Sequence, residues 1–408
     1  MDKVKILRIT PTTNRGSISR TGEQLGKLVK AEGWVSYIAY SRPGNKSESN
    51  LIRVGNKVSL FFHLFLARAF DMSGFGSYFP TKRLVKTIER INPSLIHLHN
   101  IHSYDINISV LFRFLSKSNI PIVWSQHDCW AYTGHCTHYA KIKCEKWKTM
   151  CEHCPQLNRY PRSWFWDGSK RNFLKKKELF TSVNNMYIVA VSEWIRKELT
   201  SSFLKKYPIR RIYNGIDTKV FVPRQDKEME IRNKYELGDK QILIGVAAAW
   251  GGKGISDYIE LNSIIDDNYV IVLVGVSEQL KETLPSSIKC IKRTDSMAEL
   301  SYLYSAAAVC LNLSLEESFG KTTPEALACG TPCIVYNSTA SPELVDECTG
   351  VVVSPGDVKG IYKAIKTIEG WDIATTKVKC RERARDLFDM DNNYKEYINL
   401  YKEILHVD

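Results

Sequence analysis

Long hydrophobic runs are absent from this 408-residue sequence. The most apolar stretch, VSLFFHLFLARAF at 58–70, is interrupted by His63 and Arg68 and is shorter than the roughly 18 to 20 residues that span a bilayer. The first residues, MDKVKILRIT, also lack the apolar run and small-residue cleavage site of a signal peptide. We therefore expect a protein that is made and kept in the cytosol.

A disulfide framework is not expected either, because that compartment keeps thiols reduced. Of the eleven cysteines, five lie between Cys129 and Cys154. The other six are scattered and are typical of small buried apolar residues; they are Cys290, Cys310, Cys329, Cys333, Cys348 and Cys380. The clustered five indicate a site.

Charge is divided unevenly along the chain. Residues 1–200 hold 31 Lys and Arg against 14 Asp and Glu, a net charge of +17, whereas residues 201–408 hold 26 against 30, a net of −4. The basic half is expected to meet something anionic: a phosphorylated ligand, an acidic membrane surface or nucleic acid.

Short apolar segments alternate with helical patterns in both halves. The first half contains VKILRIT (4–10), WVSYIAY (34–40), SLIHLHN (94–100), IPIVWSQHD (120–128) and MYIVAVS (186–192). The second half repeats the alternation from QILIGVAAAW (241–250) to TPCIVYN (331–337). This alternation predicts two doubly wound α/β domains, each with a parallel sheet that binds ligands at the carboxyl ends of its strands. The segment NGIDTKVFVP (214–223) has the composition of a linker.

The segment LEESFGKTTPEALACGTP (315–332) is the most informative stretch. It follows a predicted strand and leads into a helix, with Thr323 expected at the N-cap and Pro324 at the first helical position. Gly330 is expected to end that helix. Its amino end offers unpaired N–H groups, which favour a phosphate. Glu317 and Glu325, one before the turn and one on the helix, can face the same ligand.

This segment resembles the E-x7-E signature of retaining glycosyltransferases of family 4, which have the GT-B fold. The resemblance extends over most of the chain, through NRGS (14–17), HD (127–128), VSEWIRKEL (191–199), YNGIDTKVF (213–221), GKG (252–254) and ASPELV (340–345). The stretches HDCWAYTGHC (127–136) and CEKWKTMCEHCP (144–155) are similar to colanic-acid-type glycosyltransferases of bacterial surface-polysaccharide loci.

The resemblance implies a role for each matching residue. Glu325 would bind the ribose hydroxyls of a UDP- or GDP-sugar, and Glu317 would lie beside its sugar ring. His127 would lie beside the reacting sugar, so that the catalytic pair is His127 and Glu317. The remaining donor-binding residues would be Gly16, Lys253, Ser318, Phe319, Gly320, Lys321 and Thr322. Backbone N–H groups and a lysine can stabilise the leaving diphosphate without a catalytic divalent metal.

One position departs from the family pattern. The family places an arginine five or six residues before the lysine, but residues 246–252 read VAAAWGG. A cation aimed at a phosphate contributes a few kcal/mol in a desolvated site, on the order of 2 to 3. Either Arg15, Arg20 or another group replaces this arginine, or turnover depends more heavily on Lys253 and the helix end.

The cysteine segment has the spacing C-x7-C-x6-C-x2-C at Cys136, Cys144, Cys151 and Cys154. Four thiolates at such intervals suit one structural tetrahedral zinc, and His135, His138 or His153 could replace a thiol. Buried free thiols and an iron–sulfur cluster are the alternatives. The segment follows His127-Asp128 as a long loop at a strand end, and a zinc ion could supply folding free energy on the order of 10 kcal/mol to hold it.

The resemblance assigns residues 1–215 to an acceptor-binding Rossmann-like domain with the Cys-rich insertion at about 129–160. It assigns 216–385 to a nucleotide-sugar-binding Rossmann-like domain facing the first across a cleft. Residues 386–408 are expected to form a helix that returns to the first domain. The predicted activity is retaining transfer of a hexose-type sugar to a lipid-diphosphate-linked oligosaccharide in capsule, exopolysaccharide or O-antigen synthesis.

Basic segments and exposed aromatics suggest docking on the inner face of the plasma membrane. KRNFLKKKELF (170–180) is a solvated helix face or part of such a surface, and SWFWDG (163–168) adds aromatic residues. Phe61, Phe62, Leu64 and Phe65 are either part of the surface or core. Two alternatives remain open: a zinc-stapled nucleic-acid-binding protein, and a family member that binds sugar nucleotide without transferring it. Nucleic acid is not the partner that the family resemblance implies.

Overall fold

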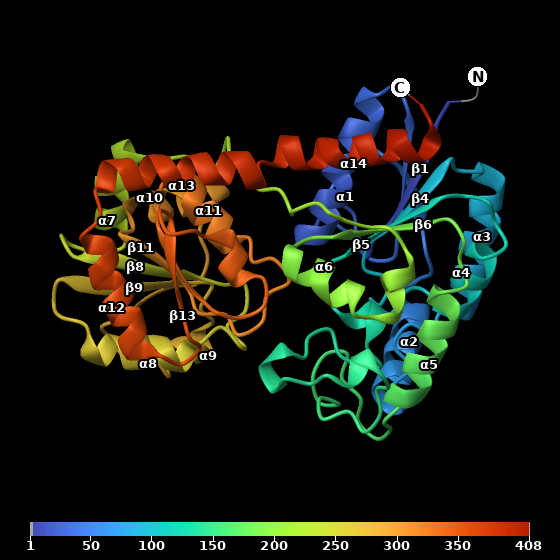
Figure 1. Ribbon diagram of the computed structural model, residues 1–408, viewed down its shortest axis with the longest axis horizontal. Helices are drawn as coiled ribbons and strands as arrows, with labels where there is room; N and C mark the ends of the chain where they lie inside the picture. Colours follow the sequence, from blue (N-terminus) through green and yellow to red (C-terminus); the bar gives the residue numbers. More distant parts are fainter. Residues whose placement is uncertain (1–2, 408) are drawn as a thin grey trace. The chain divides into compact units, whose positions relative to one another are not determined.

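The computed structural model describes residues 3–407 and divides the chain into two compact units (Figure 1). Unit 1 consists of two segments, one that ends at Ile212 and one that begins at Tyr394, whereas unit 2 is Tyr213–Asn393. Each unit has a single sheet in which all paired strands are parallel. No helix within residues 3–407 is long and apolar enough to cross a bilayer.

The sheet of unit 1 has seven strands in the order β3-β2-β1-β4-β5-β6-β7. Its strands are β1 (Lys5–Ile9), β2 (Val35–Tyr40), β3 (Asn50–Arg53), β4 (Leu95–Leu98), β5 (Ile122–Gln126), β6 (Met186–Ala190) and β7 (Ile209–Arg211). Its helices are α1 (Ser17–Ala31), α2 (Lys57–Phe70), α3 (Tyr78–Ile91), α4 (Ile108–Leu115), α5 (Ser169–Phe180) and α6 (Glu193–Thr200). Most of α14 (Met390–Leu405) also belongs to this unit.

Two successive residues of β5 show how both faces of this sheet are covered. Neighbouring side chains of a strand point to opposite faces. Trp124 packs against Phe180 of α5 with ring centroids 4.8 Å apart. The next residue, Ser125, places its hydroxyl 3.1 Å from the Tyr397 hydroxyl of α14. Helices therefore cover both faces, as the near-continuous apolar pattern of the strands requires.

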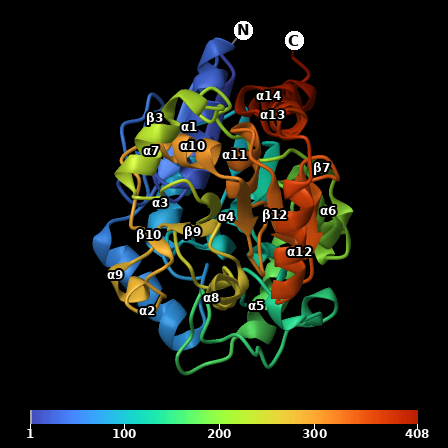
Figure 2. The same ribbon diagram turned by 90° about the vertical axis from the view of Figure 1, so that its left-hand side faces the viewer.

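The sheet of unit 2 has six strands in the order β10-β9-β8-β11-β12-β13. They are β8 (Gln241–Val246), β9 (Tyr269–Val274), β10 (Lys289–Ile291), β11 (Val309–Asn312), β12 (Cys333–Tyr336) and β13 (Gly350–Val353). The helices are α7 (Glu228–Lys234), α8 (Ile255–Ile264), α9 (Glu278–Lys281), α10 (Met297–Ala306), α11 (Thr322–Ala328), α12 (Val358–Glu369) and α13 (Ile373–Phe388). Helices α8 and α12 pack together, as do α11 and α13 (Figure 2).

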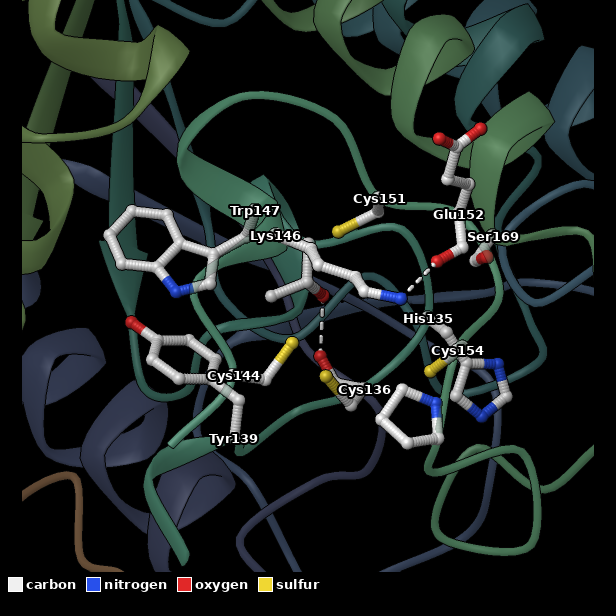
Figure 3. A pocket seen from close by; sticks show the side chains of 12 residues that line it. His135, Cys136, Tyr139, Cys144, Lys146, Trp147, Cys151, Glu152, Cys154 and Ser169 are labelled. Atoms are coloured by element: carbon white, nitrogen blue, oxygen red, sulfur yellow. Dashed lines mark hydrogen bonds between the residues drawn. The ribbon is translucent and has the colours of Figure 1, made fainter. Parts of the chain in front are cut away.

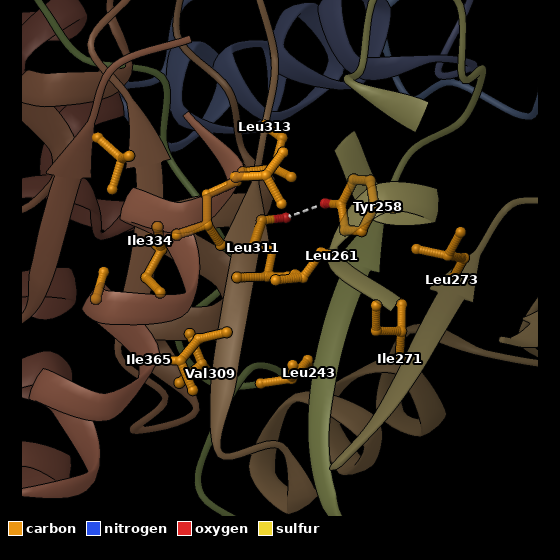
Figure 4. Packing of buried hydrophobic residues seen from close by; sticks show 14 of the residues in the cluster. Leu243, Tyr258, Leu261, Ile271, Leu273, Val309, Leu311, Leu313, Ile334 and Ile365 are labelled. Atoms are coloured by element: carbon orange, nitrogen blue, oxygen red, sulfur yellow. Dashed lines mark hydrogen bonds between the residues drawn. The ribbon is translucent and has the colours of Figure 1, made fainter. Parts of the chain in front are cut away.

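The core of unit 2 lies between the sheet and α8 and α12 (Figure 4). Leu243 and Leu311 come from the two central strands, and Leu261 and Ile365 come from the helices. All four are at most 1% exposed, and each such burial contributes about 1.5 to 3 kcal/mol. The hydroxyl of Tyr258 donates to the Leu311 carbonyl at 2.6 Å, so this large ring leaves no unsatisfied polar atom in the core.

The predicted pair of doubly wound parallel sheets is confirmed. Among the scattered cysteines, four are buried and Cys290 is half-buried, but Cys348 is exposed, so its expected burial was wrong. The helix at 170–180 is not a uniformly solvated face. Lys176 on it is only 1% exposed, because its ammonium donates to the carbonyls of Trp130 and Thr133 at 2.8 and 3.1 Å.

In each sheet the order in which successive strands are added reverses once. In unit 1 the chain winds outward from β1 to β3 and then resumes beside β1 with β4; in unit 2 it resumes beside β8 with β11. Such a switch point opens a crevice at the carboxyl ends of the two strands, where α/β proteins bind ligands. The two switch points therefore indicate where each unit binds a ligand.

Candidate active site

The loops after β8 and β11 meet through an ion pair at the switch point of unit 2. The ammonium of Lys253, in the turn after β8, contacts the carboxylate of Glu317, in the turn after β11. The hydroxyl of Ser314 donates to the same carboxylate oxygen at 3.1 Å. The Lys253 side chain is 26% exposed and that of Glu317 is 18% exposed. Both charged groups are thus held by neighbours yet remain within reach of a ligand.

Glycines fix the backbone of both loops. Gly254 has φ +67°, and a Cβ there would lie 2.6 Å from the Leu313 carbonyl oxygen. The Leu315 N–H donates to the Gly252 carbonyl at 3.1 Å. Gly320, in the second loop, has φ +86°, a conformation that other residues rarely adopt. The two loops therefore contact each other through backbone atoms, which sets the positions of the charged pair.

The helix of the E-x7-E segment begins earlier than the sequence predicts. Helix α11 starts at Thr322, so the expected N-cap at Thr323 was wrong. Thr323 is fully buried, and its hydroxyl accepts a hydrogen bond from the Asn312 side chain at 3.0 Å. Pro324 is tolerated in the first turn because an N–H there has no intrahelical acceptor. The threonine hydroxyl anchors the helix to β11 and does not cap it.

Phe319 is a core residue of this segment. Its side chain is 2% exposed and packs between Tyr213 and Phe388, with ring centroids 5.8 and 5.7 Å away. The ring holds the turn down on the body of unit 2. Only the backbone of Phe319 is left for a ligand.

Three other residues of the segment differ in their hydrogen-bond partners and therefore in the groups that they present to a ligand. Lys321 donates from its ammonium to the Gly215 carbonyl at 3.1 Å, so part of its hydrogen-bonding capacity is already used. The Ser318 hydroxyl is buried and finds no hydrogen-bond partner within residues 3–407. Glu325 is half-buried on the first turn of α11, near Tyr304, whose pKa is raised by burial and then by the negative charge of Glu325. Ser318 and Glu325 border the same turn as Glu317.

A row of three histidines lies at the carboxyl ends of β4 and β5 in unit 1. His99 Nδ1 is 3.1 Å from His127 Nε2, and the two rings stack. His97 lies on the other side of His99, with ring centroids 4.1 Å apart. Burial lowers the pKa values of His97 and His99 well below the usual range, and neighbouring positive groups lower them further. His127 therefore contacts a neutral imidazole.

The inner end of this row is held by α14. His97 Nδ1 is 2.5 Å from the Tyr401 hydroxyl, and its Nε2 is 2.8 Å from the Ser125 hydroxyl. Ser125 in turn lies within hydrogen-bonding distance of Tyr397. Both nitrogens of His97 are thus occupied, so this buried histidine is structural. Of the row, His127 is the partly exposed member.

Asp128 and His102 form a second pair beside His127, and this pairing was not predicted from the sequence. His102 Nε2 is 2.8 Å from Asp128 Oδ2, and the Trp130 N–H donates to Oδ1 at 2.9 Å. Burial alone would raise the pKa of Asp128, but His102 and the N–H donor lower it to about 2. His99, His102, His127 and Asp128 line one small cavity of about 10 Å³. The carboxylate is therefore ionised and orients His102 next to His127.

Gly16 precedes α1 in the loop after β1, at the switch point of unit 1. It has φ +76°, and the N-cap of α1 makes no side-chain hydrogen bond. No atom lies within 4 Å of a Cβ built there. Arg15, Gly16 and Ser17 are all exposed. The loop can therefore approach a ligand with its backbone, which is the property that the resemblance expects of Gly16.

The Cys-rich segment after β5 contains only three short 3-10 turns between Asp128 and α5. Cys136, Cys144, Cys151 and Cys154 are free thiols that line one cavity of about 20 Å³ (Figure 3). As the side chains are oriented, no group of three or more His, Cys, Asp or Glu residues within 3–407 is arranged to hold a metal ion. The predicted zinc site stays a prediction.

Two family models match the chain. The model described as Glycosyltransferase Family 4 matches residues 23–220, and the model described as Glycosyl transferases group 1 matches residues 241–369. The chain is 24% identical to the colanic acid biosynthesis glycosyl transferase WcaC of Escherichia coli K12, covering 98% of this chain and 100% of that one. It is also 24% identical to the O-antigen chain mannosyltransferase RfbU of Salmonella typhimurium, over 66% of this chain and 70% of RfbU.

Solved structures share the fold. A glycosyltransferase from Rickettsia africae superposes with a TM-score of 0.69 at 18% identity and covers 99% of both chains. HepE of Anabaena in complex with UDP gives a TM-score of 0.69 at 16% identity over 98% of this chain and 100% of HepE. The fold is therefore that of GT-B glycosyltransferases. The chain belongs to glycosyltransferase family 4 and is an enzyme, which decides against the nucleic-acid-binding alternative.

Some of this site could have been found in the sequence. Carboxyl ends of adjacent parallel strands share one edge of a sheet, so a histidine after β4 and another after β5 should meet. His99 and His127 do so. The sequence pattern does not predict that His102 contacts Asp128 and not His127, because His127 and Asp128 both follow the same strand. Their pairing depends on the path of the loop after β4.

Proposed function

We propose that this enzyme transfers a hexose-type sugar from a UDP- or GDP-sugar to a lipid-linked oligosaccharide, with retention of anomeric configuration. The process served would be capsule, exopolysaccharide or O-antigen synthesis. WcaC and RfbU, named for colanic acid and O-antigen synthesis, support that role, and the structures of HepE with UDP and UDP-glucose support a nucleotide-sugar donor. The observation that carries the proposal is the Lys253–Glu317 pair at the switch point of unit 2.

The donor binds to unit 2 in this proposal. A diphosphate carries more negative charge than one carboxylate, so it competes with Glu317 for the ammonium of Lys253. Glu317, released from this ion pair, then accepts hydrogen bonds from the donor sugar. The Ser318 hydroxyl, which has no partner within the described chain, and the backbone of 319–322 supply further groups. Donor binding thus exchanges one partner of Lys253 for another.

Departure of the nucleoside diphosphate develops negative charge on its phosphate oxygens. Lys253 and backbone N–H donors stabilise this charge in place, so no catalytic divalent metal is needed. Residues 246–252 hold no arginine to assist, and Ala248 and Ala249 are exposed there. Lys253 therefore carries a larger share of the stabilisation. Glu325, on the first turn of α11, accepts hydrogen bonds from the ribose hydroxyls.

Unit 1 binds the acceptor and supplies His127 to the reaction. His127 is partly exposed and contacts the neutral His99, so its imidazole lies where a sugar hydroxyl can approach it. Retention without a protein nucleophile implies that the acceptor attacks on the face that the diphosphate leaves. The departing phosphate oxygen then takes the proton of the acceptor hydroxyl. The net charge of +17 on residues 1–200 favours an acceptor that carries a diphosphate.

A thermal-shift panel of UDP- and GDP-sugars tests the donor assignment. At about 100 times Kd the matching donor stabilises the folded state by about 2.7 kcal/mol, a rise in Tm of roughly 5 to 10 °C. Glu325→Ala should abolish this rise, and Glu282→Ala, an exposed glutamate of the same unit, should preserve it. The donor assignment fails if no nucleotide sugar raises Tm, or if the rise survives in Glu325→Ala. A donor-dependent rise without sugar transfer would instead identify a binding protein that has lost transfer.

An exposed aromatic surface on unit 1 supports membrane docking. Helix α2 exposes Phe61 by 72%, Phe62 by 58% and Phe65 by 48%, whereas Leu64 is half-buried. The loop 163–167 exposes Phe165 by 83%. The two segments adjoin, because the Trp164 N–H donates to the Arg68 carbonyl of α2 at 2.6 Å. Aromatic side chains this exposed on adjoining segments are typical of a surface that is covered in use.

Basic residues accompany these aromatic side chains. Residues 53–86 contain six Lys and Arg and one acid, Asp71, which is buried against His135. The exposed cations are Arg53, Lys57, Lys82, Arg83 and Lys86. Acidic lipid headgroups attract such cations by about 1 kcal/mol each, while aromatic rings enter the interface. We therefore place α2 and the loop 163–167 on the cytoplasmic face of the membrane, where lipid-linked acceptors are available.

A further inference from the structure

Four thiol groups of the Cys-rich segment surround a cavity of the size of one ion. Cys136, Cys144, Cys151 and Cys154 all line it, and its volume is about 20 Å³. Figure 3 shows their sulfur atoms turned toward the same space. A cavity needs about 10 to 15 Å³ to hold one water molecule. The space suits a single ion and is too small for the several iron and sulfide ions of a cluster.

The segment that carries these thiols has little regular secondary structure, although Tyr132, Tyr139 and Trp147 form a buried aromatic cluster within it. Between Asp128 and α5 it contains only the 3-10 turns Trp130–Tyr132, Ala140–Ile142 and Lys146–Lys148. A loop of this length without regular structure is uncommon in a compact domain unless something fixes it. The 3-10 turns at 140–142 and 146–148 lie on either side of Cys144, and the chain then continues to the Cys151/Cys154 pair. The fold thus gathers residues that are 18 positions apart in the sequence around one point.

One lysine and one acid, Lys146 and Glu152, line the cavity, and a second lysine, Lys176, lies close to it. Four thiolates and one Zn²⁺ carry a formal charge of −2. The ammonium of Lys176 is buried and bound to the Thr133 carbonyl, and Thr133 itself lines the cavity. Lys176 forms no ion pair with an acidic group in the part of the chain that is described. Lys146, also in the lining, donates to the carbonyls of Glu152 and His153 at 2.9 and 3.0 Å.

His135 adds a second, independent observation. It is 2% exposed and lines the same cavity, and its Nδ1 is 2.7 Å from Asp71 Oδ1. Its Nε2 is buried and lacks a hydrogen-bond partner among residues 3–407. The Asp71 carboxylate fixes the imidazole ring, and a buried polar atom without a partner in the lining indicates that the cavity takes a polar or ionic occupant. His135 lies beside Cys154 in Figure 3.

We propose that Cys136, Cys144, Cys151 and Cys154 bind one structural Zn²⁺. Each thiol loses its proton to solvent on binding, and each sulfur comes to about 2.3 Å from the metal. As oriented, the four side chains do not yet form a group that holds a metal ion, so metal binding requires their side-chain rotamers to change. All four positions of the metal are then filled, so it catalyses nothing. His135 stays in contact with Asp71 and supports the site from outside.

The zinc ion fixes the segment that begins at the proposed acceptor site. Trp130 donates its N–H to Asp128, and its ring lies 5.1 Å from the ring of His102. The Thr133 hydroxyl donates to the Cys136 carbonyl at 2.5 Å, which links this turn to a proposed ligand. The metal therefore orders the loop that holds the His102–Asp128 pair beside His127.

Metal analysis of the full-length protein, purified without an affinity metal, tests this proposal. We expect one equivalent of zinc, and thiol titration of the native protein should find the four cysteines unreactive until a chelator removes the metal. Cys151→Ser should lose at least nine-tenths of the zinc, and the matched control Cys348→Ser, an exposed cysteine of unit 2, should keep it. Less than half an equivalent of zinc in wild type, with four reactive thiols at these positions, overturns the site.

Two further variants separate the ligand set from folding. His135→Gln should keep one equivalent of zinc; loss of the metal in that variant would move the fourth ligand from a thiol to the imidazole and refute the four-cysteine set. Cys144→His offers a nitrogen ligand in place of sulfur and should retain zinc with a Co²⁺ spectrum of fewer thiolate bands. If Cys151→Ser is insoluble, the wild-type stoichiometry and its thiol titration still decide. Neither readout depends on sugar transfer.

Discussion

Units 1 and 2 are built on the same kind of sheet but differ in the loops that leave their strands. In unit 2 the loops after β8 and β11 are short, rich in glycine and joined by backbone contacts, and they present a Lys–Glu pair. In unit 1 the loop after β5 has about forty residues before α5 begins, and the strand ends carry imidazoles. Unit 1 is also the basic, aromatic-faced unit. Parallel sheets therefore fix where ligands bind, whereas loop chemistry decides which ligand.

Substitution of Lys253 in unit 2 should have the largest effect on sugar transfer. Lys253→Met removes the cation of the diphosphate site, and because no arginine precedes it, transfer should fall by about 10³-fold in kcat/KM. Donor affinity measured by calorimetry should fall as well. Lys240→Met, an exposed lysine of the same unit, should leave both unchanged. Retained donor affinity and turnover in Lys253→Met would remove the diphosphate site from unit 2.

His127 should behave in the opposite way toward the donor. His127→Asn removes the imidazole that the acceptor unit presents, so kcat should fall by about 10²-fold. Donor affinity should stay within twofold of wild type, because the proposed donor site lies in unit 2. His406→Asn, an exposed histidine just beyond α14, serves as the control. A parallel loss of donor affinity would break the division of labour between the units.

Acid should weaken unit 1 before unit 2, because the three buried histidines with lowered pKa values, His63, His97 and His99, all lie in unit 1. Burial lowers the pKa of His63 to about 4, and its Nε2 accepts the Gly74 N–H at 3.1 Å, which protonation would break. The unfolded chain takes up this proton at about pH 6.5. Stability from neutral His63 is therefore complete above pH 6.5 and lost as pH falls toward 4, by on the order of 3 kcal/mol.

Hydrogen exchange followed by mass spectrometry at pH 7 and pH 5 measures this difference unit by unit. Protection should fall in unit 1 and hold in unit 2. His63→Gln should reduce the pH dependence in unit 1. Equal loss of protection in both units would contradict the histidine explanation.

The smallest expected effect concerns the membrane surface. Phe61→Ser and Phe165→Ser each remove a ring that is more than 70% exposed, so binding to vesicles with acidic lipids should fall about 10-fold per substitution. Met229→Ser, 67% exposed on unit 2, is the matched control and should not change binding. Flotation with vesicles of acidic and of neutral lipid measures the effect. Equal binding by wild type and the Phe variants would move the docking surface elsewhere.

The sequence predicted the central strands because their apolar runs are nearly continuous. It missed β3, β7 and β13, which all lie at sheet edges. The sequences of β3 and β7, NLIR and IRR, are also largely exposed. Exposed edge strands have no burial pattern to read. The sequence placed Lys253 and Glu317 in one site, and their strands adjoin.

Other features depend on contacts that no local pattern encodes. Lys176 sits in a run of three lysines, and only its place over the Trp130 ring, 3.5 Å from the centroid, separates it from its exposed neighbour Lys177. Asp71 and His135 are 64 residues apart and meet because the Cys-rich loop folds back over the end of α2. A single sequence carries no signal for such meetings.

The two tyrosines of α14 that hold His97 and Ser125 have a consequence for synthesis on the ribosome. Unit 1 is interrupted by the whole of unit 2, so the histidine row has no inner wall until the last fifteen residues emerge. A nascent chain can complete unit 2 first, whereas unit 1 stays incomplete until its last helix has been synthesised. A premature stop before Tyr394 would thus leave unit 2 complete and would expose the buried histidines of unit 1 to water.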